Sequence, residues 1–383
     1  MKDIDTAEER PPGALKEQRY QRHSLIDWFD QEQVKRARVV VVGAGATGNE
    51  VLKNLALLGT GHIHVIDFDR IETHNLTRSV LFKEEDTGRF KAEAAAEACR
   101  AIDPKVYTTF ETGDLWETLR IGDMKSYDAL FCCVDNYEAR IRLNELCLWA
   151  RVDLYNTAID SRYVCIEQYP FSRDRGCACY QCNLPPSAYA KIRERYSCGW
   201  LRKKAYEEKK IPTTAITASL AGSILCSLFL QRNHPGGPQG AVRLYFDTIS
   251  LNSTVTHLSH QEECFCSSIF HDSHYFKVKN VPGADYARLL GSEESLVLSL
   301  SDKLVLDVTC RNCGLSRAID DNVRRFDESL ALCGACRTHS NDITIKDIIT
   351  LDELSMRFSR KAVPVKFMHF TRDDTQILLE MEE

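Results

Sequence analysis

Residues 39–48 read Val-Val-Val-Val-Gly-Ala-Gly-Ala-Thr-Gly, and this stretch decides the fold. A buried parallel strand has to turn sharply here into a helix, which we expect over residues 49–58. Gly43 supplies the turn, Gly45 lets the backbone approach a phosphate, and Gly48 lets the helix pack on the strand. The first helical turn offers unpaired N–H groups and the positive end of its dipole to an anion. The spacing therefore predicts a nucleotide site in a doubly wound α/β sheet.

A second apolar run ends in an aspartate. Residues 63–66 lead into Asp67-Phe68-Asp69, and Asp67 follows Gly48 by nineteen residues. At the end of the second strand, Asp67 is placed to accept hydrogen bonds from a ribose. On their own, the glycine motif and this aspartate favour a dinucleotide, because most such fingerprints belong to NAD or FAD enzymes. An NAD-dependent oxidoreductase is therefore one interpretation.

Polar and basic side chains beyond the second strand favour ATP instead. Asn75, Arg78 and Lys91 follow it within one segment. Hydride transfer develops no charge on phosphate, whereas cleavage of ATP between its α- and β-phosphates does. Arg78 and Lys91 can bind phosphate oxygens, and Asp135, after a further apolar strand, is an oxygen ligand suited to magnesium. Because ligands of open α/β sheets sit beyond the carboxyl ends of the strands, we expect these groups to lie beside the glycine loop.

Each of these assignments has a simpler alternative. Taken singly, Arg78 and Lys91 would be interpreted as solvated charges on helix faces. Asp135 would be interpreted as a helix N-cap, since Asp and Asn both favour that position and a helical stretch follows. Asp67, considered alone, would be interpreted as the cap of a loop. The joint spacing of the motifs favours the nucleotide site over these alternatives.

Six motifs, in order and at matching spacing, resemble the ubiquitin-activating enzyme superfamily, whose simpler bacterial members include the ThiF, MoeB and HesA adenylyltransferases. The motifs are Arg19-Tyr-Gln-Arg22-His, the glycine loop, Asp67-Phe-Asp69, Asn75-Leu-Thr-Arg78, Gly88-Arg-Phe-Lys91 and Cys-Val-Asp135-Asn136. The resemblance covers residues 19 to about 266. It implies a Rossmann-like, mostly parallel sheet, a homodimer, and Mg- and ATP-dependent adenylation of the C-terminal glycine carboxylate of a ubiquitin-like β-grasp protein.

The resemblance also implies roles for individual residues. Asp67, with Asp69 beside it, holds the ribose, and Asp135 holds Mg. The triphosphate is bound by Asn75, Arg78 and Lys91, next to Gly43, Gly45 and Gly48. Arg22 is implied as an arginine finger that reaches into the partner subunit's site, and Arg19 competes for that role.

Length and composition limit the remaining possibilities. A chain of 383 residues is long enough for two or three domains. We expect a disordered tail over 1–14, an adenylation domain over 15–267 with a crossover segment at about 183–211, and a C-terminal module over 268–383. A net charge of −6 and a pI near 6 argue against nucleic acid as the main partner. The sequence has no transmembrane run or signal peptide, which predicts a cytoplasmic protein without a membrane partner.

Cysteine spacing predicts a zinc ribbon in the C-terminal module. In a reducing compartment the sixteen cysteines are metal ligands, core residues or nucleophiles. Two C-x-x-C knuckles, separated by nineteen residues, match a tetrahedral four-cysteine zinc site; their ligands are Cys310, Cys313, Cys333 and Cys336. The alternative, a redox C-x-x-C pair, lacks a thioredoxin-like context. The intervening residues are charged and short of core residues, so we expect zinc to supply much of the folding energy of this unit.

A second cysteine group lies in the predicted adenylation domain. Members of the superfamily often hold one zinc between a C-x-x-C after the nucleotide domain and a second pair near its end. The predicted ligands here are Cys179, Cys182, Cys264 and Cys266. The last two form a C-x-C, which departs from the family pattern, so that Cys177 is an alternative ligand.

Cys198 is the predicted nucleophile. It follows Cys182 by sixteen residues, and nearby arginines and lysines would depress the pKa of its thiol. In ubiquitin-type activating enzymes the catalytic cysteine occupies a similar place. The alternatives are an unreactive loop cysteine and a zinc ligand.

The sequence as a whole predicts an activating enzyme that adenylates a ubiquitin-like protein and captures it as a Cys198 thioester for transfer to a conjugating-enzyme-like protein, as in a bacterial antiviral conjugation pathway. Sulfur-carrier activation of the thiamin or molybdopterin type is the alternative within the family. A non-catalytic zinc-ribbon scaffold is an alternative outside it.

In the C-terminal tail we expect a capped helix from Thr350 and strands over 365–370 and 376–380. The sequence leaves the role of this tail open between recruiting a conjugating enzyme, binding the substrate and completing a domain.

Overall fold

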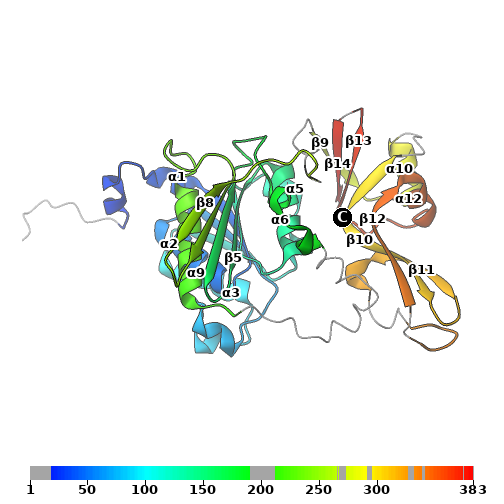
Figure 1. Cartoon of the computed structure of the whole chain (residues 1–383), viewed down its shortest axis with the longest axis horizontal. Coiled ribbons are helices and arrows are strands. Elements are labelled where there is room, and N and C mark those ends of the chain that lie inside the picture. Colours follow the sequence, from blue (N-terminus) through cyan, green and yellow to red (C-terminus); the bar gives the residue numbers. More distant parts are fainter. Residues whose placement is uncertain are drawn as a thin grey trace, which may run out of the picture.

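The computed structural model of the chain describes residues 19–189, 212–264, 266, 273–290, 296–326, 332–338, 341–373 and 375–382. Within these residues the chain forms two sheets, one of eight strands and one of six (Figure 1). No helix in the described ranges is long and apolar enough to cross a membrane.

The larger sheet is doubly wound and mostly parallel, as predicted. Its strands are β1 (Arg38–Val42), β2 (His62–Ile66), β3 (Tyr107–Glu111), β4 (Ala129–Cys132), β5 (Asp153–Ile159), β6 (Tyr163–Tyr169), β7 (Val242–Asp247) and β8 (Ser253–His257). The order is β3-β2-β1-β4-β5-β6-β7-β8; β1 to β5 are parallel and the last three antiparallel. The winding reverses between β1 and β4, which is where such sheets bind ligands.

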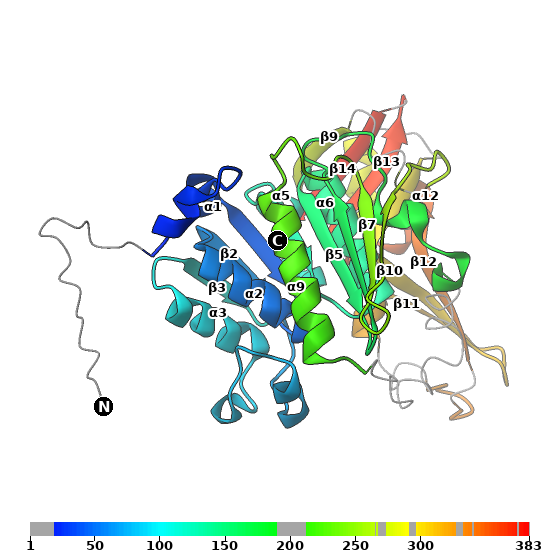
Figure 2. The same cartoon turned by 60° about the vertical axis from the view of Figure 1, so that its left-hand side comes forward.

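Helices cover both faces of this sheet (Figure 2). On one face, α2 (Ala46–Leu58), α3 (Lys91–Ile102) and α9 (Ala215–Leu230) share an apolar core with the strands. On the other, α4 (Leu115–Thr118), α5 (Ile121–Met124) and α6 (Tyr137–Ala150) do the same. Shorter elements are η1 (Gln21–Leu25), α1 (Gln31–Arg36), η2 (Thr73–Thr77), η3 (Glu84–Asp86) and η4 (Tyr180–Asn183).

Helix α2 begins three residues before the expected start at residue 49. Gly45 is its N-cap, in extended backbone, so Gly48 lies inside the first turn. A Cβ on Gly48 would sit 1.9 Å from the carbonyl oxygen of Gly43. The missing side chain therefore brings the helix directly onto the preceding turn, which is the packing role predicted for Gly48.

The segment 19–29, here called the N-terminal arm, lies at the amino ends of the strands. The Tyr20 hydroxyl bonds to Asp103, just before β3, and its ring lies against Gly59, just before β2. In Figure 2 the dark-blue segment with η1 and α1 and the lighter-blue segment between β2 and α3 lie at opposite ends of the sheet. The arm and the glycine loop are thus on opposite edges of the same subunit.

The six-stranded sheet belongs to the C-terminal part of the chain. It contains β9 (Ser273–Lys279), β10 (Val297–Cys310), β11 (Ser316–Asn322), β12 (Asn341–Thr350), β13 (Phe367–Arg372) and β14 (Thr375–Glu382). The order is β11-β10-β13-β14-β9, and β12 pairs with β10. The other elements are α10 (Gly283–Leu290), η6 (Val323–Arg325) and α12 (Leu351–Arg357). The expected capped helix and the last two strands are present, and Thr350 accepts a hydrogen bond from the backbone of Glu353 at 3.2 Å.

This part of the chain has a core of its own. Tyr286, Leu298, Phe358 and Met368 belong to one buried apolar cluster. The C-terminal part is therefore larger than a zinc ribbon, and the expectation that zinc supplies much of the folding energy of the ribbon itself stays a prediction. The expected domain boundary at 267–268 falls among residues outside the described ranges and stays a prediction.

The two sheets are joined through α5 and α6. The carboxylate of Glu380, on β14, accepts from the backbone N–H groups of Ile121 at 2.7 Å and Gly122 at 3.2 Å. The Arg142 guanidinium lies 4.2 Å from the centre of the Phe367 ring, and Phe367 belongs to the core cluster beneath α6. The C-terminal sheet therefore packs on one helical face of the larger sheet, away from α2 and α3.

Two buried histidines on β2 share one hydroxyl. His62 Nε2 and His64 Nδ1 lie 2.9 and 2.7 Å from Thr109 Oγ1. A hydroxyl can donate one hydrogen bond and accept two, so at most one of the two ring nitrogens accepts from Thr109, and both contacts can be satisfied while the rings are neutral. Burial lowers the pKa of both histidines, that of His64 to about 4.

Acid should destabilise the fold through this pair. In the unfolded chain these histidines have a pKa near 6.5. Their contribution to the free energy of unfolding is therefore fully present above pH 6.5 and is lost as the pH falls toward 4. For His64 the loss amounts to about 3 kcal/mol. We expect His64→Asn to flatten the pH dependence of the free energy of unfolding between pH 6.5 and 4, measured by urea denaturation. Parallel curves for variant and wild type would contradict this origin.

Candidate active site

The glycine loop is shaped by close contacts on two sides. Gly43 has φ of +91°, a conformation that favours glycine, and a Cβ there would lie 2.6 Å from the carbonyl oxygen of Cys133. Around Gly45, by contrast, no described atom lies within 4 Å of where a Cβ would point. The loop is thus pressed against the end of β4 on one side and open on the other, where a phosphate can approach the N-terminus of α2.

Asp67 fastens this loop to the end of β2. Its Oδ2 accepts from the backbone N–H of Ala44 at 2.6 Å, and its Oδ1 accepts from that of Asp69 at 2.7 Å. Burial raises the pKa of Asp67, against the opposing effects of Lys91 and these two N–H donors. Asp67 therefore does cap the loop, as its simpler interpretation predicts. Because a carboxylate has about four lone-pair sites, capping leaves room for ribose hydroxyls, and that role stays a prediction.

Lys91 is held beside this aspartate pair. Its ammonium lies 2.6 Å from Asp69 Oδ2, and its backbone N–H donates to the Asp69 carbonyl at 2.9 Å. The residue is 9% exposed, at the first position of α3. The alternative of a solvated charge on a helix face is therefore wrong for Lys91, whose charge is fixed at the mouth of the site.

Asn75 and Arg78 lie on η2 and at its end. The Asn75 side chain accepts from the backbone N–H of Glu72 at 2.9 Å, and Arg78 Nη1 donates to the carbonyl of His74 at 2.9 Å. Both side chains thus shape the turn that carries them. Their predicted contacts with a triphosphate stay predictions.

Asp135 follows β4 and is exposed, while its neighbour caps the next helix. The Asn136 side chain accepts from the Ala139 backbone N–H at 2.9 Å. The N-cap alternative for Asp135 is therefore wrong. Asp135 comes two residues after Cys133, against which Gly43 packs, so its backbone leaves β4 at the same end of the sheet as the glycine loop.

Two further residues hold the site together, and sequence reasoning assigned them no role. Asn49 is fully buried; its Nδ2 donates to the Ala44 carbonyl at 2.7 Å, and its Oδ1 accepts from the Leu81 backbone N–H at 2.9 Å. It therefore ties the glycine loop to the segment after η2. A buried amide directly after the third glycine was the available signal.

Arg140 does the same for the loop that carries Asp135. Its guanidinium donates to the Val134 carbonyl at 2.5 Å and to Asn156 Oδ1 at 2.8 Å. Asn156 in turn donates to Glu167 Oε2 at 2.6 Å, and Arg243 pairs with the same carboxylate. This buried chain of charge-assisted hydrogen bonds fixes the end of β4 relative to β5 and β6.

The four predicted zinc-ribbon cysteines come together. The sulfurs of Cys310, Cys313, Cys333 and Cys336 all lie within 4.8 Å of one another. Three of the separations are 3.5, 3.6 and 3.8 Å. A tetrahedral ion with Zn–S bonds of about 2.3 Å separates its sulfur ligands by about 3.8 Å, so the residues present fit zinc.

The second cysteine group gathers three of its four predicted members. Cys179 Sγ lies 3.7 Å from Cys264 Sγ and 3.8 Å from Cys182 Sγ. The Cys266 sulfur is not a member of this three-sulfur group, but it interacts with the thiols of Cys179 and Cys264 and accepts from Gln181 Nε2 at 3.0 Å. Its role as the fourth ligand therefore stays a prediction.

Other predicted residues have different outcomes. Cys177 is buried and is not a member of this three-sulfur group, although it was weighed as a ligand. His260 Nδ1 lies 3.7 Å from Cys182 Sγ, a neighbour that sequence reasoning did not consider. Arg22 is exposed on η1 in the N-terminal arm. Cys198 lies outside the described residues, so its predicted role is untested.

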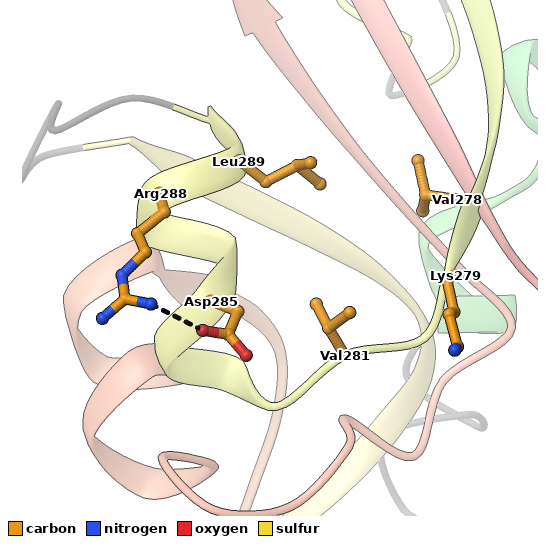
Figure 3. Close-up of a pocket in the computed structure, with 6 residues that line it drawn as sticks. All are labelled: Val278, Lys279, Val281, Asp285, Arg288 and Leu289. Atoms are coloured by element: carbon orange, nitrogen blue, oxygen red, sulfur yellow. Dashed lines mark hydrogen bonds and ion pairs between the residues drawn. The ribbon is translucent and has the colours of Figure 1, made fainter.

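One cavity, of about 490 Å³, lies in the C-terminal part of the chain (Figure 3). Three apolar and three charged side chains line it, and Asp285 forms an ion pair with Arg288 at 3.5 Å. The lining residues, from β9, α10 and the segment between them, are Val278, Lys279, Val281, Asp285, Arg288 and Leu289. None of them is a predicted site residue, so this cavity is separate from the nucleotide site.

Comparison with known proteins bears on the family and the fold. A model of the ThiF family matches residues 18–266, a range that contains every motif of the predicted nucleotide site. A crystal structure of E. coli MccB with ATP superimposes with a TM-score of 0.54 and 22% identity, covering 67% of this chain and 75% of that one. At that identity the likeness shows the fold.

Curated relatives match over parts of their length. Adenylyltransferase and sulfurtransferase MOCS3 of Caenorhabditis briggsae is 29% identical over 219 residues, 54% of each chain. SUMO-activating enzyme subunit uba-2 of Caenorhabditis elegans is 34% identical over 125 residues, 32% of this chain and 22% of that one. The sulfur carrier protein adenylyltransferase of Thermus thermophilus is 32% identical over 173 residues, 44% of this chain and 64% of that one. The chain thus spans from about a fifth to less than two thirds of these relatives.

The two cysteine groups predict two zinc ions per chain. We expect Cys179→Ser to lower the zinc content, measured by elemental mass spectrometry, from two ions per chain to one, because the substitution removes one of the three thiolates that lie together in this group. Cys177→Ser is the matched control and should keep both ions, since its buried sulfur is not in the group. A content of one in the unsubstituted chain would mean that the C-x-C departure has removed the site on the larger sheet.

Proposed function

Because this chain belongs to the ThiF family, we propose that it uses ATP and Mg²⁺ to adenylate the C-terminal carboxylate of a ubiquitin-like β-grasp protein. The observation that carries the proposal is the grouping at the switch point of the sheet. The open side of the glycine loop, the buried Lys91 ammonium and the exposed Asp135 all belong to the carboxyl ends of β1, β2 and β4, which supports a shared site there. A cation, an anion and a helix N-terminus together suit a nucleotide triphosphate with its metal.

The reaction follows from these groups. An oxygen of the carrier's C-terminal carboxylate attacks the α-phosphorus, the bond to the β-phosphate breaks, and pyrophosphate leaves. Negative charge grows on the leaving phosphates, so cations fixed beforehand lower the barrier without having to reorganise. Lys91 is fixed in this way by Asp69, and Arg78 would join it. Asp135 would hold Mg²⁺, which when bound neutralises charge on the phosphate oxygens.

The fold supports a homodimer in which Arg22 serves the neighbouring site. The N-terminal arm contacts Gly59 at the far end of α2, and the glycine loop is at the near end. A helix of 13 residues is about 20 Å long, which is beyond the reach of an arginine side chain. If Arg22 contacts a phosphate, that phosphate therefore belongs to a second copy. Arg19 is a weaker candidate, since it donates to the Ile102 carbonyl at 2.8 Å and pairs with Asp103.

We further propose that Cys198 takes the acyl group as a thioester for transfer to a conjugating-enzyme-like protein, in a bacterial ubiquitin-like pathway of the antiviral kind. The support is its place in the sequence, sixteen residues after Cys182 and among basic residues. The relatives include both a SUMO-activating enzyme subunit and a sulfur carrier protein adenylyltransferase, so sulfur-carrier activation remains the second candidate. Family membership gives no support to the NAD-dependent oxidoreductase or the non-catalytic scaffold.

The magnesium assignment predicts a selective loss. We expect Asp135→Asn to reduce Mg-dependent ATP–pyrophosphate exchange at least a hundredfold while leaving the thermal unfolding temperature unchanged, because an exposed carboxylate contributes to the metal site and not to packing. Asp128→Asn is the matched control, since that exposed aspartate precedes the opposite end of the same strand and accepts from the Arg38 backbone N–H at 2.8 Å. An unchanged exchange rate in Asp135→Asn would remove Asp135 from the site.

The thioester assignment predicts a separation of two activities. Adenylation needs no thiol, so Cys198→Ala should keep pyrophosphate exchange and lose any carrier adduct that a reducing thiol releases. Cys177→Ala, a buried cysteine in the same half of the chain, should keep both. A thiol-labile adduct that survives in Cys198→Ala would move the role to another cysteine, and loss of zinc in that variant would make Cys198 a ligand and favour sulfur-carrier activation.

A further inference from the structure

Asp103 is a buried carboxylate that receives the N-terminal arm. The residue is 1% exposed and follows the last turn of α3. Its Oδ1 accepts from the Lys105 backbone N–H at 3.0 Å, which orients the side chain. Its Oδ2 accepts from the Tyr20 hydroxyl and lies 3.7 Å from Arg19 Nε. Two consecutive residues of the arm thus converge on one charge, which is buried with partners that satisfy it.

The ring of Tyr20 fits a place that only glycine leaves open. Gly59, the C-cap of α2, has φ of +75°, and a Cβ there would lie within 2.3 to 2.9 Å of three Tyr20 side-chain atoms. Glycine is therefore required both by the backbone conformation and by the ring that lies against it. The Tyr20 hydroxyl and ring together fix where the arm meets the subunit.

A second attachment follows Arg22. His23 Nδ1 lies 2.6 Å from Gln31 Oε1, and Gln31 Nε2 donates to the Leu58 carbonyl at 2.9 Å. The His23 ring also packs on Phe29, with ring centres 4.7 Å apart. The arm is therefore held at Tyr20 and at His23, and Arg22 lies between these two points. Both points are at the same end of α2, on the edge opposite the glycine loop.

We propose that Asp103 is a positioning residue, which fixes the arm so that Arg22 is presented to the nucleotide site of a second copy of this chain. This inference rests on the proposed role of Arg22. An exposed arm without fixed contacts would have to be ordered each time a phosphate is bound, at a cost in conformational entropy. Because the Asp103 carboxylate orders the arm when the chain folds, the Arg22 guanidinium is already in place when charge develops on the phosphates.

The consequence is an asymmetry between subunits that a general role in stability would not produce. In a dimer of this kind each catalytic site combines the glycine loop of one chain with the arm of the other. A change at Asp103 should therefore harm the site of the partner and spare the site of its own chain. A loss of folding stability would instead lower both.

Mixed dimers with two affinity tags separate these cases. One chain carries Arg22→Ala and supplies the working nucleotide site; the other carries Lys91→Ala and supplies the intact arm. Exchange of labelled pyrophosphate into ATP is measured with the ubiquitin-like carrier that supports exchange by the unsubstituted chain. We expect Asp103→Asn to lower kcat about tenfold when it is in the chain that supplies the arm, because a hydrogen bond to a charged group is lost. In the other chain it should change kcat less than twofold.

Asp153→Asn is the matched control. That carboxylate is also 1% exposed, opens β5 at the same edge of the sheet, and pairs with Arg173 at 3.1 Å without touching the arm. Its effect should be equal in either chain. An equal effect of Asp103→Asn in both chains would overturn the positioning role while leaving the Arg22 role intact.

Two further results complete the test. If the reference pair without any change at Asp103 regains no activity after mixing, Arg22 does not act in the partner's site, and the inference falls with that proposal. Independently of catalysis, Asp103→Asn should raise amide hydrogen exchange over residues 19–29, and Tyr20→Phe should raise it less, since the ring contact with Gly59 remains. Unchanged exchange in Asp103→Asn would contradict the attachment itself.

Discussion

The rest of the structure depends on the close packing of one turn between a strand, a helix and a neighbouring strand. Gly43 and Gly48 meet with no room for a Cβ between them, and Gly43 also lies against the backbone of Cys133. This contact sets the direction of α2 and brings its N-terminus to the switch point between β1 and β4. Polar side chains then fix the turn: Asp67 holds Ala44 from one side, and Asn49 holds it from the other. The place where a nucleotide can bind is therefore settled by backbone packing before any catalytic group is considered.

Local sequence predicted those features that local chemistry determines. The glycine loop, the aspartate at the end of β2 and the paired cysteine knuckles each follow from residues that are close in sequence. Contacts between distant segments were not predictable in the same way. Asn49 bonds to Leu81 and Asp103 to Tyr20 because the fold brings them together, and nothing near Asp103 in the sequence marks it as a partner of the arm. Likewise, the C-terminal sequence predicted two strands, but it did not predict that Glu380 would accept hydrogen bonds from the start of α5.

The same distinction explains the corrections. Asp135 and Asn136 are both good N-caps, and only the helix geometry decides that Asn136 takes this role and leaves Asp135 facing out. Cys266 completes the expected number of zinc ligands, and in the fold its sulfur lies between Gln181 and the thiols of Cys179 and Cys264, so its role as a ligand stays a prediction. Together the observations describe a subunit with features at both ends of its strands: the groups that we propose to bind phosphate are at the carboxyl ends, and the arm is fixed at the amino ends. Such an arrangement makes sense in an assembly that brings the edges of two copies together.

The central claim is that this site cleaves ATP between its α- and β-phosphates on behalf of a carboxylate. It is tested most directly by phosphorus NMR of the products formed from MgATP and a ubiquitin-like protein with a free C-terminal glycine. The account predicts AMP and pyrophosphate, formed only when that carboxylate is free and not when it is amidated. Formation of ADP and inorganic phosphate, or equal turnover with the amidated protein, would contradict it.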